Sequence, residues 1–279
     1  MTIGQLVQRV ARTESAQRIL SRPRAERVAQ VLIQATTVHE RTRFVYLELS
    51  ASFRLARYRL RRSGRPIYIR HNTVDPLVLD EIFYTGHYTL PDEVESVFAG
   101  LGRPPVILDL GANVGLFGVW ALDRFPGCTI TAFEPDTTNA AVAQMTMDAN
   151  DVGERWRLNK AAAAAHNGRV SFLSGEFSRS RIDAEGGTEV EAVDVFPYLE
   201  GVDFAKIDIE GGEWEILGDP RFQELELPAL VLEFHPDQAP GPDPRSLALD
   251  TLGRAGYETQ LVYDFAPGQG MVWAWQPGK

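Results

Sequence analysis

The chain has few features that would stabilise it outside the cell or hold it in a membrane. Its single cysteine, Cys128, leaves no partner for an intrachain disulfide, and we expect it to be a buried, inert residue beside an apolar strand. No apolar run reaches the roughly 20 residues that a membrane-spanning helix needs. Residues 1–20 carry charges at Arg9, Arg12, Glu14 and Arg18, so they lack the apolar core of a secretory signal. We therefore expect a cytoplasmic protein without a transmembrane segment.

The first 65 residues contain no lysine, but they contain 14 arginines and four glutamates. This segment has a net charge of +10, while the whole chain has −10, so the remainder carries −20. Such asymmetry indicates either an anionic partner or a basic surface that packs against an acidic body. No aromatic-interleaved nucleic-acid module accompanies the arginines, and the acidic remainder would repel a polyanion. We expect no nucleic-acid partner.

The pattern in residues 1–88 predicts a separate N-terminal unit. Apolar residues at helical spacing predict helices over 2–21 and 24–36. The pattern becomes β-like from residue 44 to 69, with a hairpin that turns at 63–66, and a short helix follows over 75–83. We expect this unit to cover the acceptor pocket or to form a homodimer through its helices.

Residues 89–279 alternate short apolar strands with helices, which is typical of a parallel sheet covered by helices. The closing pair of strands, around a Pro267-Gly268 turn, predicts a C-terminal antiparallel hairpin. The expected strands are 106–110, 129–133, 156–163, 203–209, 230–234, 257–263 and 271–275, and the main helices are 115–124, 139–150 and 245–254. The fold class is thus α/β with a mostly parallel, seven-stranded, Rossmann-like sheet.

A glycine-rich turn follows the first of these strands, in the sequence Asp-Leu-Gly-Ala-Asn-Val-Gly-Leu-Phe over 109–117. Gly111 allows close backbone approach, and Gly115 allows the next helix to pack near the sheet. Asp109 stands where a dinucleotide phosphate would need positive potential, and Asn113 replaces the second glycine of the dinucleotide motif. Because Asp109 suits the cationic amino group of a methionine moiety, directly or through water, the turn favours S-adenosylmethionine (SAM) over NAD.

An acid also ends the second strand, about twenty residues beyond the turn. Glu134 is placed to accept hydrogen bonds from two ribose hydroxyls, and Pro135 or its neighbour would lie against the adenine. Either feature alone would also fit a nucleotide-binding α/β domain of another kind. The order and spacing of the two features together favour a SAM site.

Four further polar residues lie at or just beyond the ends of the fourth and fifth strands, where ligands bind in open α/β sheets. Asp208 and Glu210 alternate with apolar residues, as do Glu233 and His235, so each pair is expected to share a face. We expect His235 to accept a proton from the substrate, with Glu233 or Asp208 orienting it. The same four residues could instead coordinate Mg²⁺, which we consider possible but do not favour.

These motifs resemble those of the FkbM-type methyltransferase family. The resemblance rests on the glycine-rich turn, Phe-Glu-Pro-Asp (133–136), Lys-Ile-Asp-Ile-Glu-Gly-Gly-Glu-Trp-Glu-Ile-Leu (206–217) and Glu-Phe-His (233–235), and it covers about residues 70–236. It implies a class I methyltransferase fold and SAM-dependent O-methylation of a small molecule, such as a sugar of a glycoside or glycolipid or a polyketide-type natural product. The expected cofactor contacts are Tyr88, Asp109, Gly111, Ala112, Asn113, Gly115, Phe117, Glu134, Pro135, Asp136, Ala161 and Asp208. The expected reaction centre comprises Asp208, Glu210, Glu233 and His235.

Two other functions remain open from the sequence. One is an NAD-dependent oxidoreductase, which Asn113 and Asp109 disfavour. The other is a non-catalytic SAM-binding scaffold that holds a partner through the basic N-terminal helices. Crowded carboxylates at the strand ends argue against a scaffold, because such a cluster is costly without a role.

Overall fold

A computed structural model describes residues 23–50, 53–173, 181–182, 187–265 and 268–278. The chain divides into two compact units, one ending at Tyr88 and the other beginning at Thr89. The helix expected over 2–21 lies outside the described residues. Among the described helices, none has both the length and the apolar character needed to cross a bilayer.

The first unit contains the expected helix and hairpin, together with one helix that the sequence analysis missed. Its elements are α3 (Pro23–Gln34), a 3₁₀ turn (Ala35–Thr37), α4 (Arg41–Leu49), β1 (Arg54–Arg59), β2 (Pro66–His71), α5 (Asp75–Asp80) and a π-helical turn (Glu81–Thr85). The β-like prediction was wrong for residues 44–49, which belong to α4. Phe44 and Glu48, one helical turn apart, are both buried on the inner face of α4. Packing of this face against the hairpin outweighs the β propensity of the sequence.

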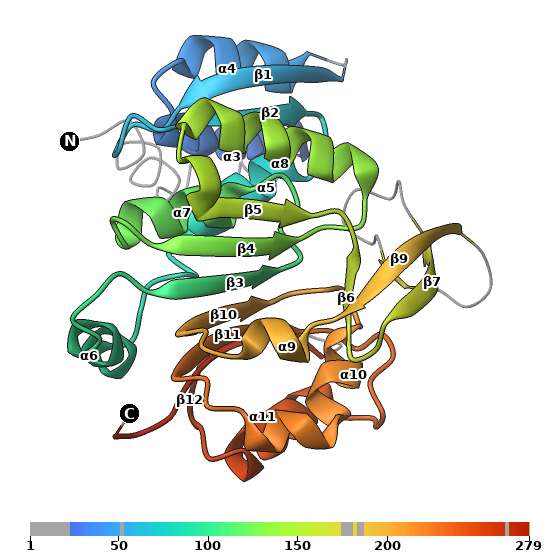
Figure 1. Cartoon of the computed structure of the whole chain (residues 1–279). Helices are drawn as coiled ribbons and strands as arrows, with labels where there is room; N and C mark the ends of the chain where they lie inside the picture. The colour runs from blue at the N-terminus through green and yellow to red at the C-terminus, as the bar shows by residue number, and fades with distance from the viewer. Residues whose placement is uncertain (1–22, 51–52, 174–180, 183–186, 266–267, 279) are drawn as a thin grey trace, which may run out of the picture. The chain divides into compact units, whose positions relative to one another are not determined.

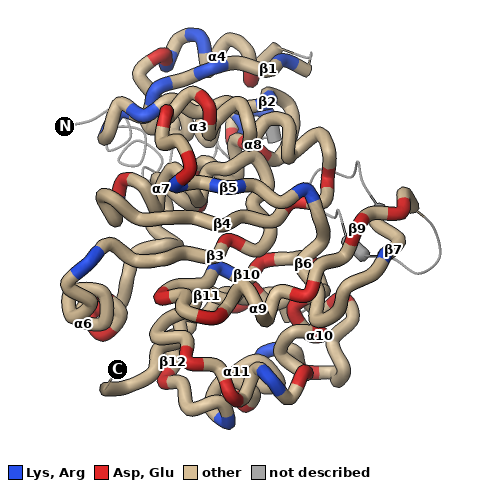
Figure 2. The backbone as a smooth tube through the Cα atoms, viewed as in Figure 1, with Lys and Arg blue, Asp and Glu red and all other residues tan. Residues whose placement is uncertain are grey.

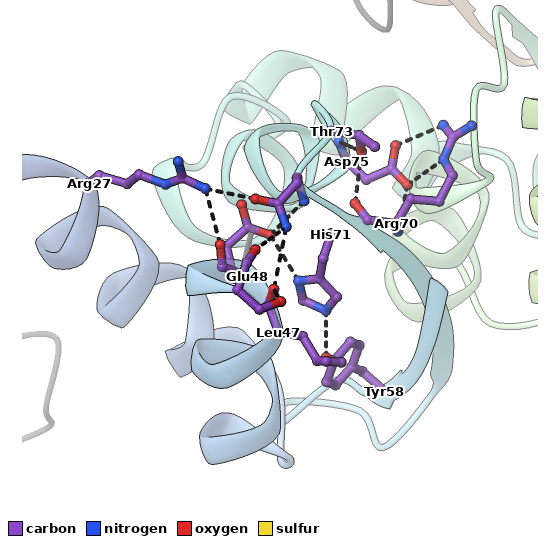
Figure 3. A network of polar contacts seen from close by, with 10 residues as sticks. Arg27, Leu47, Glu48, Tyr58, Arg70, His71, Thr73 and Asp75 are labelled. Atoms are coloured by element: carbon purple, nitrogen blue, oxygen red, sulfur yellow. Dashed lines mark hydrogen bonds and ion pairs between the residues drawn. The ribbon is translucent and has the colours of Figure 1, made fainter. Parts of the chain in front are cut away.

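A buried polar network ties α3 and α4 to the hairpin (Figure 3). The fully buried His71 lies with Nδ1 2.8 Å from the Glu48 carboxylate and with Nε2 2.6 Å from the Tyr58 hydroxyl. Because a carboxylate only accepts, Nδ1 carries the hydrogen in the pair with Glu48. Arg27 donates to the backbone oxygen of Glu48 at 3.1 Å and to Asn72 at 2.9 Å. The network satisfies polar groups that would otherwise be costly to bury.

The second unit is built on a seven-stranded sheet of order β12-β13-β11-β10-β3-β4-β5 (Figure 1). Strands β10, β11, β3, β4 and β5 run parallel, and β13 is antiparallel to both β11 and β12. The strands are β3 (Val106–Leu110), β4 (Thr129–Phe133), β5 (Trp156–Asn159), β10 (Phe204–Ile207), β11 (Ala229–Phe234), β12 (Glu258–Phe265) and β13 (Gln269–Trp275). This is the mostly parallel class I methyltransferase fold with a C-terminal antiparallel hairpin that the sequence predicted.

Helices cover both faces of this sheet. They are α6 (Asp92–Gly100), α7 (Leu116–Arg124), α8 (Thr137–Asn150), α9 (Phe196–Leu199), α10 (Glu213–Gly218) and α11 (Pro244–Arg254). Alternation along β10 separates two cores: Phe204 packs among aromatic rings of α6 and α7, while Ala205 and Ile207 join the core under α9, α10 and α11. The single cysteine, Cys128, is buried as expected.

A second sheet, of order β6-β9-β7-β8, was not foreseen (Figure 1). It comprises β6 (Ala162–Ala164), β7 (Gly168–Leu173), β8 (Arg181–Ile182) and β9 (Thr188–Asp194). The strand expected over 156–163 is therefore wrong in extent. Residues 156–159 form β5 of the large sheet, and the chain enters the small sheet at Ala162.

Candidate active site

The glycine-rich turn after β3 adopts the backbone conformation that its sequence indicated. Gly111, Asn113 and Gly115 have φ of +87°, +50° and +84°. The amides of Gly111 and Ala112 both donate to the carbonyl of Phe133, at 3.1 and 2.9 Å, which fastens the turn to the end of β4. A Cβ on Gly111 would overlap the carbonyl oxygen of Asp208. The turn therefore lies directly against the end of β10.

Close helix packing involves a different glycine from the one expected. A Cβ on Gly115 would make ordinary contact with Trp156, at 3.4 Å, whereas one on Gly118 would overlap the indole ring. Gly115 is needed for its left-handed backbone at the start of α7. Gly118 is the residue that lets α7 approach β5.

Glu134, at the end of β4, organises the same turn. Its Oε2 accepts the amide of Asn113 at 2.8 Å, and its Oε1 accepts the amide of Asp136 at 2.9 Å. Burial raises the pKa of Glu134 to about 7, although these backbone hydrogen bonds oppose the shift. Each carboxylate oxygen can accept a further hydrogen bond. Glu134 can therefore hold the glycine turn and accept from ligand hydroxyls at once.

Asp109 faces a cation of the protein itself. The side chain is fully buried, and the Lys206 ammonium lies 3.5 Å from Oδ1. Lys206 also lies 3.2 Å from the Asp208 carboxylate and donates to the carbonyl of Gly111 at 2.7 Å. Burial raises the pKa of Asp109 to about 6, against the opposing charge of Lys206. Lys206 thus joins two strand ends and the turn.

His235 is held by an acid that the sequence analysis did not select. Oε1 of the fully buried Glu213 accepts the backbone amide of His235 at 2.7 Å and lies 3.1 Å from Nδ1. Trp214 fixes the carbonyl of His235 through its indole nitrogen, at 2.9 Å. Burial disfavours the charged ring, but the hydrogen bond and charge of Glu213, with Glu210 and Asp208, outweigh it and raise the pKa of His235 to about 10. The ring is an imidazolium at neutral pH.

The other carboxylates gather around Nε2 of this ring. Glu210 and Glu233 lie 3.5 and 3.7 Å from it. Ligand atoms of Asp208, Glu233 and His235 all lie within 4.8 Å of one another, a spacing that could hold a metal ion. Burial, with the charges of Asp208 and Glu233, raises the pKa of Glu210 to about 8, and His235 opposes the shift. Glu210 also has a strained left-handed backbone, with φ of +53°.

The four residues expected at the reaction centre are therefore brought together, although β10 ends at Ile207 and simple strand alternation does not extend to Glu210. The remaining expected cofactor residues lie in varied surroundings. Asp136 caps α8 by accepting the amides of Thr138 and Asn139. Phe117 packs in the core against Trp120 and Phe204. Pro135 is half-buried, Ala161 is buried, and Tyr88 belongs to the other unit.

Lys206, Glu213 and Gln269 are polar residues of the site that sequence reasoning left without a role. Gln269 donates to Glu233 at 2.7 Å from the first position of β13. Lys206 interrupts an otherwise apolar buried strand, and a buried lysine requires a counter-charge. That signal was present in the sequence. Nothing local distinguished Glu213 from its exposed neighbour Glu215.

The ends of β3, β4 and β10 suit a ligand with hydroxyls at one end and a positive charge at the other. Glu134 and Asp208 supply carboxylate acceptors on either side of the glycine turn. Among the described residues, Oδ1 of Asn113 is buried in this turn without a hydrogen-bond partner. An unpaired buried acceptor beside two carboxylates fits the hydroxyls and ammonium of SAM better than the phosphates of NAD.

Comparison with solved structures gives distant matches. The crystal structure of WbdD, a bifunctional kinase-methyltransferase, matches at 15% identity and a TM-score of 0.41, over 66% of this chain and 38% of WbdD. The chain thus matches well under half of that protein's length. A precorrin-6y C5,15-methyltransferase from Geobacter metallireducens matches at 16% identity and a TM-score of 0.38, over 69% of this chain and 92% of that one.

No curated protein matches the chain. The family described as methyltransferase FkbM domain, however, matches residues 109–258, which is more than half of the 279 residues. This stretch contains the glycine turn, Glu134, Lys206 and the whole cluster around His235. The chain belongs to the FkbM methyltransferase family.

Proposed function

We propose that this methyltransferase is SAM-dependent and methylates a hydroxyl oxygen of a small molecule, such as a sugar of a glycoside or glycolipid or a polyketide-type natural product. The observation that carries the proposal is the pair of carboxylates, Glu134 and Asp208, which directly follow β4 and β10, the two strands beside β3 and its glycine turn. When bound, SAM supplies an electrophilic methyl group on a positively charged sulfur. Nucleophilic attack by the hydroxyl oxygen forms the new C–O bond while the C–S bond breaks.

Glu134 would accept from the ribose hydroxyls, with Pro135 beside the adenine. Asp208, which is partly exposed, would face the methionine ammonium. Asp109 would act indirectly, because it is fully buried and already faces Lys206. This differs from the direct or water-mediated contact that the sequence suggested.

The acceptor hydroxyl loses a proton as its oxygen attacks, and a base within hydrogen-bond reach contributes roughly 10²–10⁴-fold to such steps. The sequence favoured His235 for this role. An imidazolium cannot accept a proton, and the pKa of about 10 keeps His235 charged. We therefore assign proton acceptance to Glu210, whose carboxyl has a pKa of about 8 and so becomes able to accept a proton as pH rises through that value. His235 then positions the Glu210 carboxylate, and Glu213 positions His235.

A metal-assisted reaction is a second candidate, because Asp208, Glu233 and His235 converge closely. Mg²⁺ there would lower the pKa of a bound hydroxyl. Lys206 and the His235 imidazolium already neutralise these carboxylates, so we favour the metal-free reaction.

Calorimetry on the full chain tests the proposal by comparing SAM, S-adenosylhomocysteine and NADH. We expect both adenosyl ligands to bind and NADH to leave the protein unaffected. A Glu134→Ala variant should weaken binding of both, whereas Glu191→Ala, on the exposed side of β9, should not. NADH binding without SAM binding would indicate the oxidoreductase. SAM binding with no methyl transfer to any glycoside or polyketide in an acceptor panel would favour the scaffold.

A further inference from the structure

The outer side of α4 and the residues that lead into β1 expose large apolar side chains. Tyr46, Leu49 and Phe53 are 73%, 42% and 54% exposed. Tyr46 and Leu49 are three residues apart on one face of α4, opposite the buried Phe44 and Glu48. Phe53 follows Leu49 by four residues in the chain, so one short segment of this small unit exposes three large apolar side chains. Such exposure indicates an interaction surface.

Arginines surround these apolar side chains. Arg43, three residues before Tyr46 on α4, is exposed, and its guanidinium lies 5.8 Å from the centre of the buried Tyr58 ring. Arg54 is exposed at the first position of β1, next to Phe53 in the chain, although the strand face that it shares with Ala56 and Tyr58 is buried further along. Both are exposed, and Figure 2 shows basic segments along both α4 and β1. We call Arg43, Tyr46, Leu49, Phe53 and Arg54 the α4–β1 surface. The exposed Arg57, Arg61 and Arg62 of the hairpin add to its positive field.

The carboxylates of this region do not neutralise that field at the surface. Residues 38–71 contain two acids, Glu40 and Glu48. Glu40 is paired with Arg59, at 3.1 Å, and also accepts the backbone amide of Arg59 at 3.0 Å. Glu48 is turned inward to His71. The α4–β1 surface is therefore both cationic and apolar.

We propose that the α4–β1 surface docks on an anionic lipid bilayer. A polyanion such as DNA would use the arginines but would leave Leu49 and Phe53 in water. A bilayer interface accepts both, because aromatic and aliphatic side chains enter the acyl boundary while arginines reach the headgroups. Tyrosine in particular is enriched at this depth. This inference does not depend on the proposed reaction.

Sedimentation of the full chain with vesicles tests the proposal. Vesicles of phosphatidylcholine mixed with phosphatidylglycerol should retain the protein, those of phosphatidylcholine alone should retain much less, and salt should weaken binding. Arg43→Gln with Arg54→Gln should lower partitioning roughly 25-fold, at roughly fivefold per arginine. Tyr46→Ser with Phe53→Ser should lower it roughly tenfold. All four side chains are exposed, and the Arg43 variant removes one cation–π contact, with Tyr58. The variants should therefore keep the parent's circular dichroism, and the melting temperature measures the effect of that contact.

Matched controls lie in the other unit. Met145→Ser removes a side chain of similar exposure, and Arg157→Gln removes an exposed guanidinium, so both should sediment like the parent. The proposal is overturned if neither vesicle retains the protein, or if both double variants bind normally. It is also overturned if the arginine variant alone loses binding and double-stranded DNA competes with the vesicles, because the surface would then be a general polyanion site.

Discussion

The carboxylate of Glu213 holds His235 at two points, since one oxygen accepts the backbone amide at 2.7 Å and lies 3.1 Å from Nδ1 of the ring. The other oxygen accepts the amide of Gly211 at 2.8 Å. A single buried acid therefore fixes the end of β11, the turn after β10 and the charge of the imidazole. The charge of the His235 ring therefore depends on a fully buried residue that the sequence analysis left without a role.

Glu213→Gln should lower the pKa of His235 by about 1–2 units, because the ring loses its nearest negative charge. In the parent the raised pKa contributes stability that is full below about pH 6.5 and is lost as pH rises towards 10. The variant should lose that contribution at lower pH. Nuclear magnetic resonance titration of the ring measures the shift. Glu215→Gln is the control, because it removes only the exposed pair with His166, and an unchanged His235 titration in Glu213→Gln would contradict the assignment.

Glu210→Gln should lower kcat roughly 10²-fold or more and leave the binding of S-adenosylhomocysteine nearly unchanged. In the parent, kcat should rise with pH through about 8 as the Glu210 carboxyl ionises. The variant should lack this rise. Steady-state rates across pH, with binding measured by calorimetry, separate catalysis from affinity. A His235→Ala variant that loses the pH dependence while Glu210→Gln keeps it would return the role of base to the imidazole.

Lys206→Met should destabilise the protein by about 3–5 kcal/mol, because Asp109 and Asp208 would face each other without their shared cation. Adding Asp109→Asn should recover part of the loss, since one of the two charges is then gone. Denaturant unfolding measures both variants. Lys160→Met, at an exposed position, should be neutral, and equal losses in the single and double variants would show that the two residues are not coupled.

Asp80→Asn should stabilise the protein at neutral pH. Burial raises the pKa of Asp80 to about 6, and one of its oxygens has no hydrogen-bond partner among the described residues. The folded state therefore favours the protonated acid, so this contribution is full below about pH 4 and is lost as pH rises through 6. We expect a gain of about 1–2 kcal/mol at pH 7.5 after allowance for partial exposure. Melting curves at pH 7.5 and 4 check the result, and a gain of equal size at both would disprove the cause.

Extensive EDTA treatment should leave methyl transfer unchanged, because Lys206 and the His235 ring already supply positive charge at the acidic cluster. The measurement is the initial rate before and after chelation, with Mg²⁺ or Mn²⁺ added back. Activity that falls on chelation and returns with the metal would establish the metal-assisted alternative.

Sequence periodicity predicted the large sheet well, because β3, β10 and β11 are buried on both faces and, like β4, are each followed by a helix. It failed at α4, where residues that favour strands form a helix whose inner face carries Phe44 and Glu48. It also failed at β6, where a run of alanines leaves the large sheet for a small one. Alanine side chains are too small to indicate which neighbouring strand a segment will pair with.

The candidate site could be predicted as far as its strand ends. Glu134 and Asp208 directly follow strands, and Glu233 is the penultimate residue of β11, so topology alone brings them to one edge of the sheet. The hydrogen bonds that hold His235 beside these carboxylates could not be predicted. Their acceptor, Glu213, lies 22 residues earlier in the chain, at the first position of α10. The protonation of the ring follows from that pairing and from the neighbouring carboxylates, which outweigh the opposing effect of burial. Local sequence does not record these contacts.

The absence of a side chain at Gly111 allows its backbone to rest on the carbonyl of Asp208. The glycine turn and the residues that follow β10 are consequently packed against each other and cannot move independently. Transplanting either segment alone from a relative would leave mismatched surfaces, so attempts to retarget this scaffold should exchange residues 109–117 and 206–213 as a pair.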